Sequence, residues 1–124
     1  MHPDMERLTI EEHNGKKIIF VNYSGLKEAG MIELVNRHRE LTLQTALPFL
    51  ADYRKTYVSP AYMIHAKRFV ETTKHTIDKG AFLGVDRVKS MILKGILLVY
   101  GVNYKTFESK EDAIAFLADS TPTP

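Results

Sequence analysis

Residues 79–118 alternate between short apolar stretches and longer stretches of helical length, with almost no sequence between them. The order is strand, helix, strand, helix. Such alternation is typical of α/β domains built from crossover units, in which helices cover a mostly parallel sheet. The segment therefore predicts an α/β fold. It contains no cluster of residues that specifies a reaction, a metal or a ligand.

Length and composition predict one soluble globular domain. The chain has 124 residues, of which 44% are hydrophobic and 26% are charged, and both values are ordinary for such a domain. We expect the domain to span residues 1–118, followed by a flexible tail at 119–124. The 17 basic and 15 acidic residues are mixed along the sequence. Because a nucleic-acid binder more often has a dense basic stripe, no nucleic-acid partner is predicted.

Several kinds of site are excluded or disfavoured by residue types and spacing. Cysteine is absent, which excludes disulfides, thiolate catalysis and cysteine zinc sites. The histidines do not follow metal-ligand spacing, since His65 and His75 are ten positions apart on one predicted helix. We predict no metal and no other cofactor.

The sequence also favours a cytoplasmic location. The N-terminal segment is polar and lacks the apolar core of a secretory signal. The longest apolar run, at 96–100, is far shorter than the roughly 20 residues needed to cross a bilayer. We therefore predict no integral membrane association.

Local signals place the individual elements. Asn14-Gly15 predicts a type I′ hairpin turn. Ser59, Asp86 and Ser109 are suited to cap helices, and Gly80 is suited to end one. The expected elements, in order, are strands 7–11 and 17–23, helix 26–42, strand 47–53, helix 60–78, strand 81–85, helix 87–102, strand 104–108 and helix 110–118.

This β-β-α-β-α-β-α-β-α order resembles the STAS fold of anti-anti-sigma factors, and more closely small bacterial STAS-like (SpoIIAA-like) proteins without a settled role. The resemblance is carried by the hairpin ending at 21–26, the strand at 82–85 and the segment 106–114. These are matches of fold type and contain no catalytic motif. The resemblance implies a mixed, mostly parallel five-stranded sheet with flanking helices and a non-enzymatic role in protein interaction or regulation.

Ser59 has two interpretations. In anti-anti-sigma factors, a regulatory phosphate is carried by a Ser or Thr at the start of the helix after the third strand, and Ser59 occupies the matching position here. A phosphate there would be favoured by the helix dipole. However, residues 56–61 lack the Asp-Ser-Ser-Gly-like stretch of those proteins. Helix capping explains Ser59 equally well.

Asp52 and Asp86 are predicted near the carboxyl ends of strands, where open α/β sheets place ligand crevices. The alternative function is therefore binding of a small apolar or anionic ligand, lipid-like or nucleotide-like, near Asp52, Ser59 and Asp86. His38 falls on the inward face of its predicted helix. A buried histidine is more often structural than catalytic, and we predict no catalytic residue.

The helix expected at 87–102 is apolar on more than one side. At 100° per residue, its buried side is predicted to comprise Val88, Ile92, Gly95, Ile96, Val99 and Val102. Leu93, Leu97 and Tyr100 then form a second apolar ridge beside the polar side. The ridge is a surface for self-association, a groove for another partner or an entrance for an apolar ligand, or it is covered by another helix of the domain. We favour a protein-interaction domain that forms homodimers.

Overall fold

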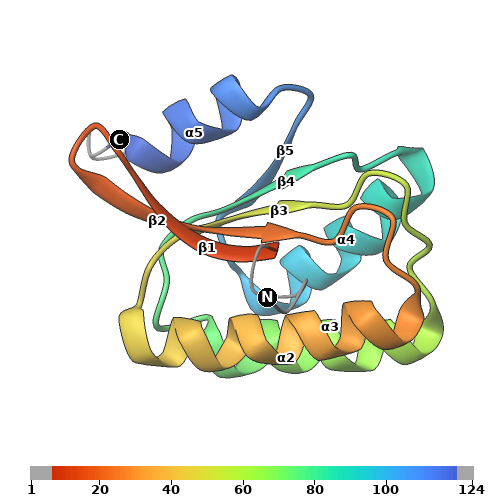
Figure 1. The fold of residues 1–124 in the computed structure, drawn as a ribbon. Helices are drawn as coiled ribbons and strands as arrows, with labels where there is room; N and C mark the ends of the chain where they lie inside the picture. Colours follow the sequence, from red (N-terminus) through yellow and green to blue (C-terminus); the bar gives the residue numbers. More distant parts are fainter. Residues whose placement is uncertain (1–6, 120–124) are drawn as a thin grey trace.

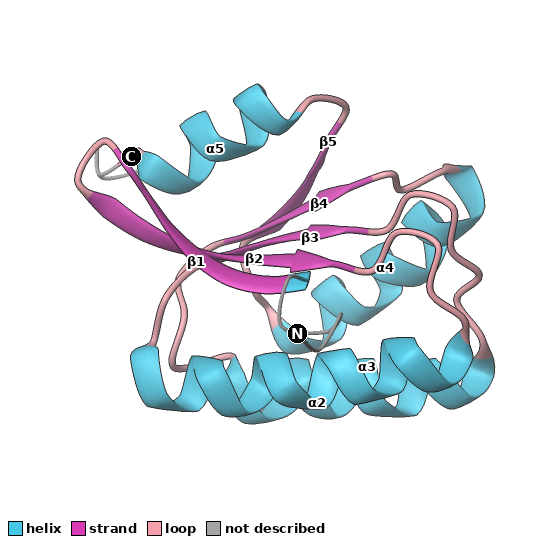
Figure 2. Ribbon diagram, viewed as in Figure 1, coloured by secondary structure: helices cyan, strands magenta, loops and turns pink. Residues whose placement is uncertain are grey.

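A computed structural model describes residues 7–119 and shows a sheet with helices on both faces (Figures 1 and 2). The elements are β1 (Leu8–His13), β2 (Lys16–Asn22), α2 (Glu28–Thr45), β3 (Phe49–Asp52), α3 (Pro60–Thr73), β4 (Gly80–Leu83), α4 (Arg87–Tyr100), β5 (Tyr104–Phe107) and α5 (Lys110–Ala118).

The sheet contains the five strands in the order β1-β2-β3-β4-β5. Strands β1 and β2 are antiparallel, and the other three neighbouring pairs are parallel. The hairpin turn has φ of 53° at Asn14 and 79° at Gly15, as a type I′ turn requires. The predicted α/β fold with a mixed, mostly parallel five-stranded sheet is confirmed.

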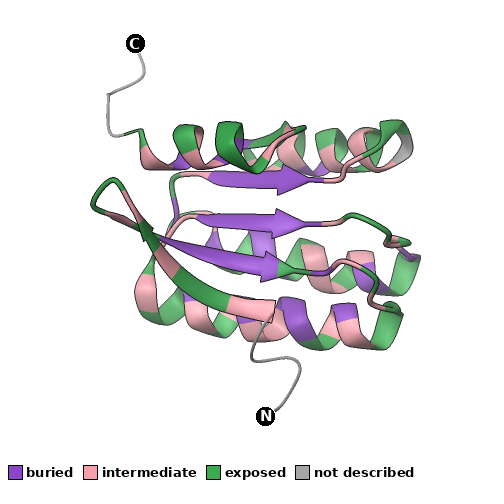
Figure 3. Ribbon diagram, turned by 45° about the horizontal axis from the view of Figure 1, so that its top comes forward, coloured by how far each residue is buried: buried purple, intermediate pink, exposed green. Residues whose placement is uncertain are grey.

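The helices divide unequally between the two faces of the sheet. Helices α2, α3 and α4 lie on one face, and α5 lies alone on the other (Figure 1). Strand residues alternate between the faces, so Ile19 and Val21 belong to the larger core cluster while Ile18 and Phe20 pack with α5. The inner strands are buried on both sides (Figure 3), which suits their apolar sequences.

The predicted helix starts are confirmed by side-chain hydrogen bonds. The Ser59 hydroxyl accepts from the Tyr62 N–H at 3.1 Å, and the Asp86 carboxylate accepts from the Lys89 N–H at 2.9 Å. Ser109 caps α5 in the same way. Each cap satisfies one of the free N–H groups of a first helical turn.

The predicted end of the helix expected at 60–78 is wrong. Helix α3 stops at Thr73, because the chain turns there: the Thr76 N–H donates to the Thr73 carbonyl at 2.8 Å. Gly80 is the first residue of β4 and does not cap a helix. Of the tail expected at 119–124, residues 120–124 lie outside the described part of the chain.

Gly80 is required by close approach of aromatic rings. A Cβ atom at this position would lie 2.6 Å from Phe49 Cζ and 2.8 Å from Tyr104 Cδ1. The Phe49 ring is packed against His38, Phe69 and Phe82 and has little freedom to move aside.

We therefore expect Gly80→Ala to lower the free energy of unfolding by about 1–3 kcal/mol through overpacking. Gly95→Ala is the matched control, because a Cβ there meets nothing within 4 Å, and it should raise stability by about 0.5–1 kcal/mol through helix propensity. Urea denaturation measures both. Parental stability of Gly80→Ala would contradict the described packing.

Candidate functional site

Helix α4 is held to the sheet by a different side from the one predicted. Leu93, Leu97 and Tyr100 are half-buried and pack against the main core cluster. Of the two alternatives left open by the sequence, this packing favours partial cover by their own domain. That these residues form an interaction surface stays a prediction. The buried side of α4 was not predicted because apolar residues occupy most of its circumference, so that periodicity does not fix which side faces the sheet.

Of the residues expected on the buried side of α4, some are buried and others are exposed. Ile96 is buried, but Ile92 and Val99 are exposed. The side chain of Val88 lies outside the described residues. Three large apolar side chains protrude from this helix: Met91, Leu98 and Val99 are 72%, 86% and 78% exposed.

An apolar groove of about 640 Å³ runs between α3 and α4. Pro60 and Met63 line it from the α3 side, and Ile92 and Val99 line it from α4. Gly95 also lines the groove, and the space where its Cβ would lie is open. The absence of a side chain at Gly95 therefore widens the groove.

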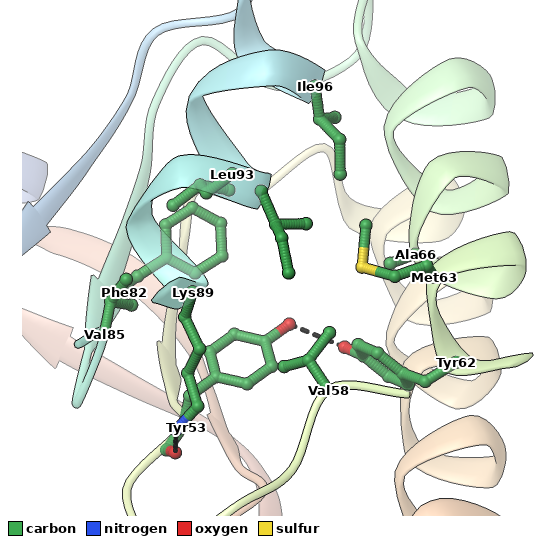
Figure 4. Close-up of a pocket in the computed structure, with 11 residues that line it drawn as sticks. Tyr53, Val58, Tyr62, Met63, Ala66, Phe82, Val85, Lys89, Leu93 and Ile96 are labelled. Atoms are coloured by element: carbon green, nitrogen blue, oxygen red, sulfur yellow. Dashed lines mark hydrogen bonds between the residues drawn. The ribbon is translucent and has the colours of Figure 1, made fainter. Parts of the chain in front are cut away.

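A smaller cavity of about 50 Å³ lies beneath the groove (Figure 4). The two share Val58, Met63, Ile92 and Ile96 as lining residues. Figure 4 shows Met63 on α3 pointing toward Leu93 and Ile96 on α4 across the space. Lys89 lines the cavity as well, and its ammonium group donates to the Tyr53 carbonyl at 3.2 Å.

The polar groups of this cavity are two tyrosine hydroxyls that bind each other. Tyr53 Oη and Tyr62 Oη are 2.6 Å apart, and the ring of Tyr53 stacks on Tyr23 with centroids 4.7 Å apart. Burial raises the pKa of Tyr53 to about 12 and the pKa of Tyr62 well above its ordinary value. These phenols are therefore neutral at pH 7 and do not act as general bases.

A second inner cavity of about 50 Å³ lies deeper, between the sheet and the three helices. It shares Tyr53, Ala66, Phe82, Leu93 and Ile96 with the first cavity. His38 of α2 and Tyr104 of β5 also line it.

The His38 ring is packed between aromatic residues. Its centroid lies 4.4 Å from that of Phe69 and 4.8 Å from that of Phe49. Burial lowers the pKa of His38 to about 3, because a charged imidazolium would lose its hydration there. His38 is therefore neutral at pH 7.

The three polar residues predicted as site candidates are not brought together around one cavity. Asp52 lines a depression with Arg7 and Lys110, whereas Asp86 lines a neighbouring one with Glu108. Ser59 lines neither of them, although its neighbours Val58 and Pro60 line the apolar groove.

Each of these residues has a local structural interaction. The Asp52 carboxylate accepts from the guanidinium group of Arg54 at 2.6 and 3.0 Å, and from its backbone N–H at 2.9 Å. Burial alone would raise the pKa of Asp52, but the Arg54 hydrogen bonds and charge lower it overall. Ser59 and Asp86 cap α3 and α4.

Within the described segment 7–119, no three His, Asp or Glu side chains lie close enough together to hold a metal ion. None of the helices in that segment has the length and apolar character needed to cross a membrane.

The sequence did not predict a groove here, because Ile92, Gly95 and Val99 were expected on the buried side of the helix. The available signal was Gly95, which stands alone inside an otherwise strongly helical and apolar segment. A glycine costs about 1 kcal/mol relative to alanine at such a position, so it often has a packing or functional reason. The part of the groove wall formed by residues 57–63 could not be predicted, because it depends on how α3 and α4 pack against each other.

Comparison with known proteins supports the fold. No family model matches the sequence, and no significantly similar curated protein is found. An uncharacterized protein from the DUF3478 family, with a SpoIIAA-like fold, from Shewanella loihica PV-4 is 16% identical. Its alignment covers 89% of this chain and 91% of that chain, with a TM-score of 0.63.

An anti-sigma-factor antagonist (STAS) domain protein from Planctomyces limnophilus is also similar in structure. It is 12% identical, and its alignment covers 90% of this chain and 98% of that chain with a TM-score of 0.61. The resemblance to the STAS fold expected from the order of elements is therefore confirmed. At this level of identity the likeness concerns the fold, and the chain has a SpoIIAA- or STAS-like fold.

His38 predicts a specific pH dependence of stability. Its pKa is about 3 in the folded protein and about 6.5 when exposed, so below pH 6.5 the unfolded chain binds a proton that the folded protein excludes. This group should lower the free energy of unfolding by up to about 1.4 kcal/mol per pH unit as the pH falls from 6 to 4.

Urea denaturation at pH 7, 6, 5 and 4 tests this expectation in the parent and in His38→Phe, which preserves the aromatic contacts. The variant should lose stability less steeply with falling pH. His75→Gln, at an exposed position, is the control and should follow the parent. An identical slope for the parent and His38→Phe would show that His38 is not buried as described.

Proposed function

We propose that this chain is a non-enzymatic binding domain that holds an elongated apolar small molecule between α3 and α4. The observation that carries the proposal is the apolar groove and the inner cavities that share its lining residues. This proposal develops the alternative predicted from the sequence, with a different location: the ligand lies along Met63 and Gly95 and not near Asp52 and Asp86.

The size and composition of the groove support this proposal. Its volume of about 640 Å³ falls within the range of typical small-molecule sites, which are mostly apolar with a few placed polar groups. Lys67 and the tyrosines Tyr57 and Tyr100 provide polar atoms at its walls. An apolar ligand would cover Ile92 and Val99, which are exposed to water in the free protein, and this burial favours binding.

The chemistry of the cavities supports binding over catalysis. The buried phenols of Tyr53 and Tyr62 are protonated at pH 7 and occupied with each other. His38 is surrounded by aromatic rings. General acid–base catalysis needs a group whose pKa lies near the working pH and that reaches the substrate, and neither the tyrosines nor His38 has such a pKa.

The regulatory role of Ser59 stays a prediction. Ser59 is 4% exposed, and its hydroxyl accepts a hydrogen bond from the Tyr62 N–H. Phosphorylation would require the first turn of α3 to open. Because Val58 and Pro60 line the groove, a phosphate at Ser59 would change the groove directly.

Gly95→Leu tests the proposed site with the least risk to the fold, because the added side chain enters open space. We expect 1-chlorohexane, followed by NMR titration, to shift the amide signals of α3 and α4 in the parent. Gly95→Leu should weaken this binding by about tenfold or more by occupying the groove. Lys94→Leu, at an exposed position outside the groove, is the control and should bind normally. Equal binding by all three proteins would contradict the site.

Self-association is the second candidate function. The residues that support it differ from the predicted ridge of Leu93, Leu97 and Tyr100. Met91, Leu98 and Val99 expose apolar surface on one helix, and a second copy of the chain would remove it from water. We expect sedimentation equilibrium at micromolar concentration to show a dimer that Leu98→Lys dissociates. A monomer at all concentrations would exclude this candidate.

A further inference from the structure

The deeper inner cavity has two buried hydrogen-bonding groups without protein partners. His38 Nε2 and the Tyr104 hydroxyl make no hydrogen bond within the described part of the chain. Their residues are 2% and 4% exposed, and both line the cavity of about 50 Å³. Both rings also pack against Phe49, with centroid distances of 4.8 Å for His38 and 5.1 Å for Tyr104.

The hydroxyl of Thr73 lies close to that of Tyr104, but no hydrogen bond joins them in either direction. Burial raises the pKa of Tyr104 to about 12, and the nearby Thr73 side chain acts in the opposite direction. However, the Thr73 hydroxyl donates its proton to the Phe69 carbonyl at 2.6 Å. Buried polar groups are normally hydrogen-bonded, and an unpaired one costs free energy. Two such groups in one cavity point to something that binds there.

We propose that the ligand carries one neutral hydrogen-bonding group, a hydroxyl or a carbonyl oxygen, on the end that reaches His38 and Tyr104. This inference rests on the proposed apolar site, since the inner cavities share their lining with the groove. A hydroxyl or carbonyl oxygen would accept from the Tyr104 O–H, or from His38 in the tautomer protonated at Nε2. The remainder of the ligand would lie along the apolar walls.

The surroundings favour a neutral group over a charged one. Among the residues that line the deeper cavity, His38 carries the one ionisable nitrogen, and burial keeps it uncharged at pH 7. Lys89 lines only the outer of the two inner cavities, and its ammonium group is bound to the Tyr53 carbonyl and lies 4.0 Å from Asp86. A carboxylate inserted to His38 would therefore be buried without a cation, at a large cost.

Helix α4 contributes a wall that the two inner cavities share. Leu93 and Ile96 line both of them, so a rotamer change of Leu93 or a small shift of α4 would join the spaces. Ile96 is the one fully buried apolar residue among the described side chains of this helix, whereas α2 buries Met31, Leu34 and Val35. A movement of α4 therefore disrupts less of the core than a movement of α2 would.

Three hexyl probes test the proposal on the intact protein: 1-hexanol, 1-chlorohexane and hexanoate. Dissociation constants are measured by NMR titration at pH 7 for the parent, His38→Phe and Tyr104→Phe. For each protein, the dissociation constant of 1-chlorohexane is divided by that of 1-hexanol. Comparing this ratio between proteins cancels the cost of removing each probe from water, because that cost is the same for every protein. Both variants keep the aromatic ring, and Tyr104→Phe removes one unpaired hydroxyl, so both are expected to fold.

We expect this ratio to fall about fivefold in each variant, as the loss of one hydrogen bond predicts. The ¹⁵N signals of the His38 ring should move with 1-hexanol and not with 1-chlorohexane. Hexanoate should bind at least about tenfold more weakly than 1-hexanol.

The outcomes separate this inference from the proposed function. If 1-chlorohexane binds between α3 and α4 but the ratio is the same in all three proteins, His38 and Tyr104 do not recognise the ligand and this inference is overturned. Hexanoate binding as tightly as 1-hexanol overturns the requirement for a neutral group. Absence of binding by every probe overturns the proposed function itself.

Discussion

Helix α4 has more apolar side chains than the sheet and α3 together can bury. Leu93, Ile96 and Leu97 face the core, but Met91, Leu98 and Val99 protrude into water. Large exposed apolar side chains gathered on one helix often mark a site of interaction. The same helix has a glycine at position 95 where a side chain would fit. Of these protruding side chains, Val99 lines the groove, and the missing side chain at Gly95 widens it.

In contrast to α4, the surroundings of Phe49 are tightly packed. Its ring contacts His38, Phe69, Phe82 and Tyr104, and Gly80 is required because a Cβ would touch it. This tightly packed cluster fixes β3, β4 and β5 relative to α2 and α3. The cavities lie between this rigid part and the sparsely buried α4, so one wall is fixed and the other is able to adapt. Ligand sites are commonly built from a rigid scaffold and one mobile element.

The sequence predicted the fold more completely than the site. The Asn14-Gly15 turn and the Ser59, Asp86 and Ser109 caps are local signals, and each has the expected geometry. The phase of α4 was not predicted, because a helix with apolar residues on all sides buries whichever side its neighbours cover. That His38 and Tyr104 line one cavity was also beyond the sequence, because they are far apart along the chain and only the packing of α2 on the sheet brings them together.

The central claim is that α4 forms an adaptable wall over an apolar ligand site. Amide hydrogen exchange, with and without a saturating apolar ligand such as 1-hexanol, tests it most directly, because exchange reports how often each helix opens. In the free protein we expect the α4 amides to exchange faster than those of α2 and α3. The ligand should slow exchange in α4 and leave α5, on the other face of the sheet, unchanged. Exchange in α4 as slow as in α2, or without any response to the ligand, would contradict the account.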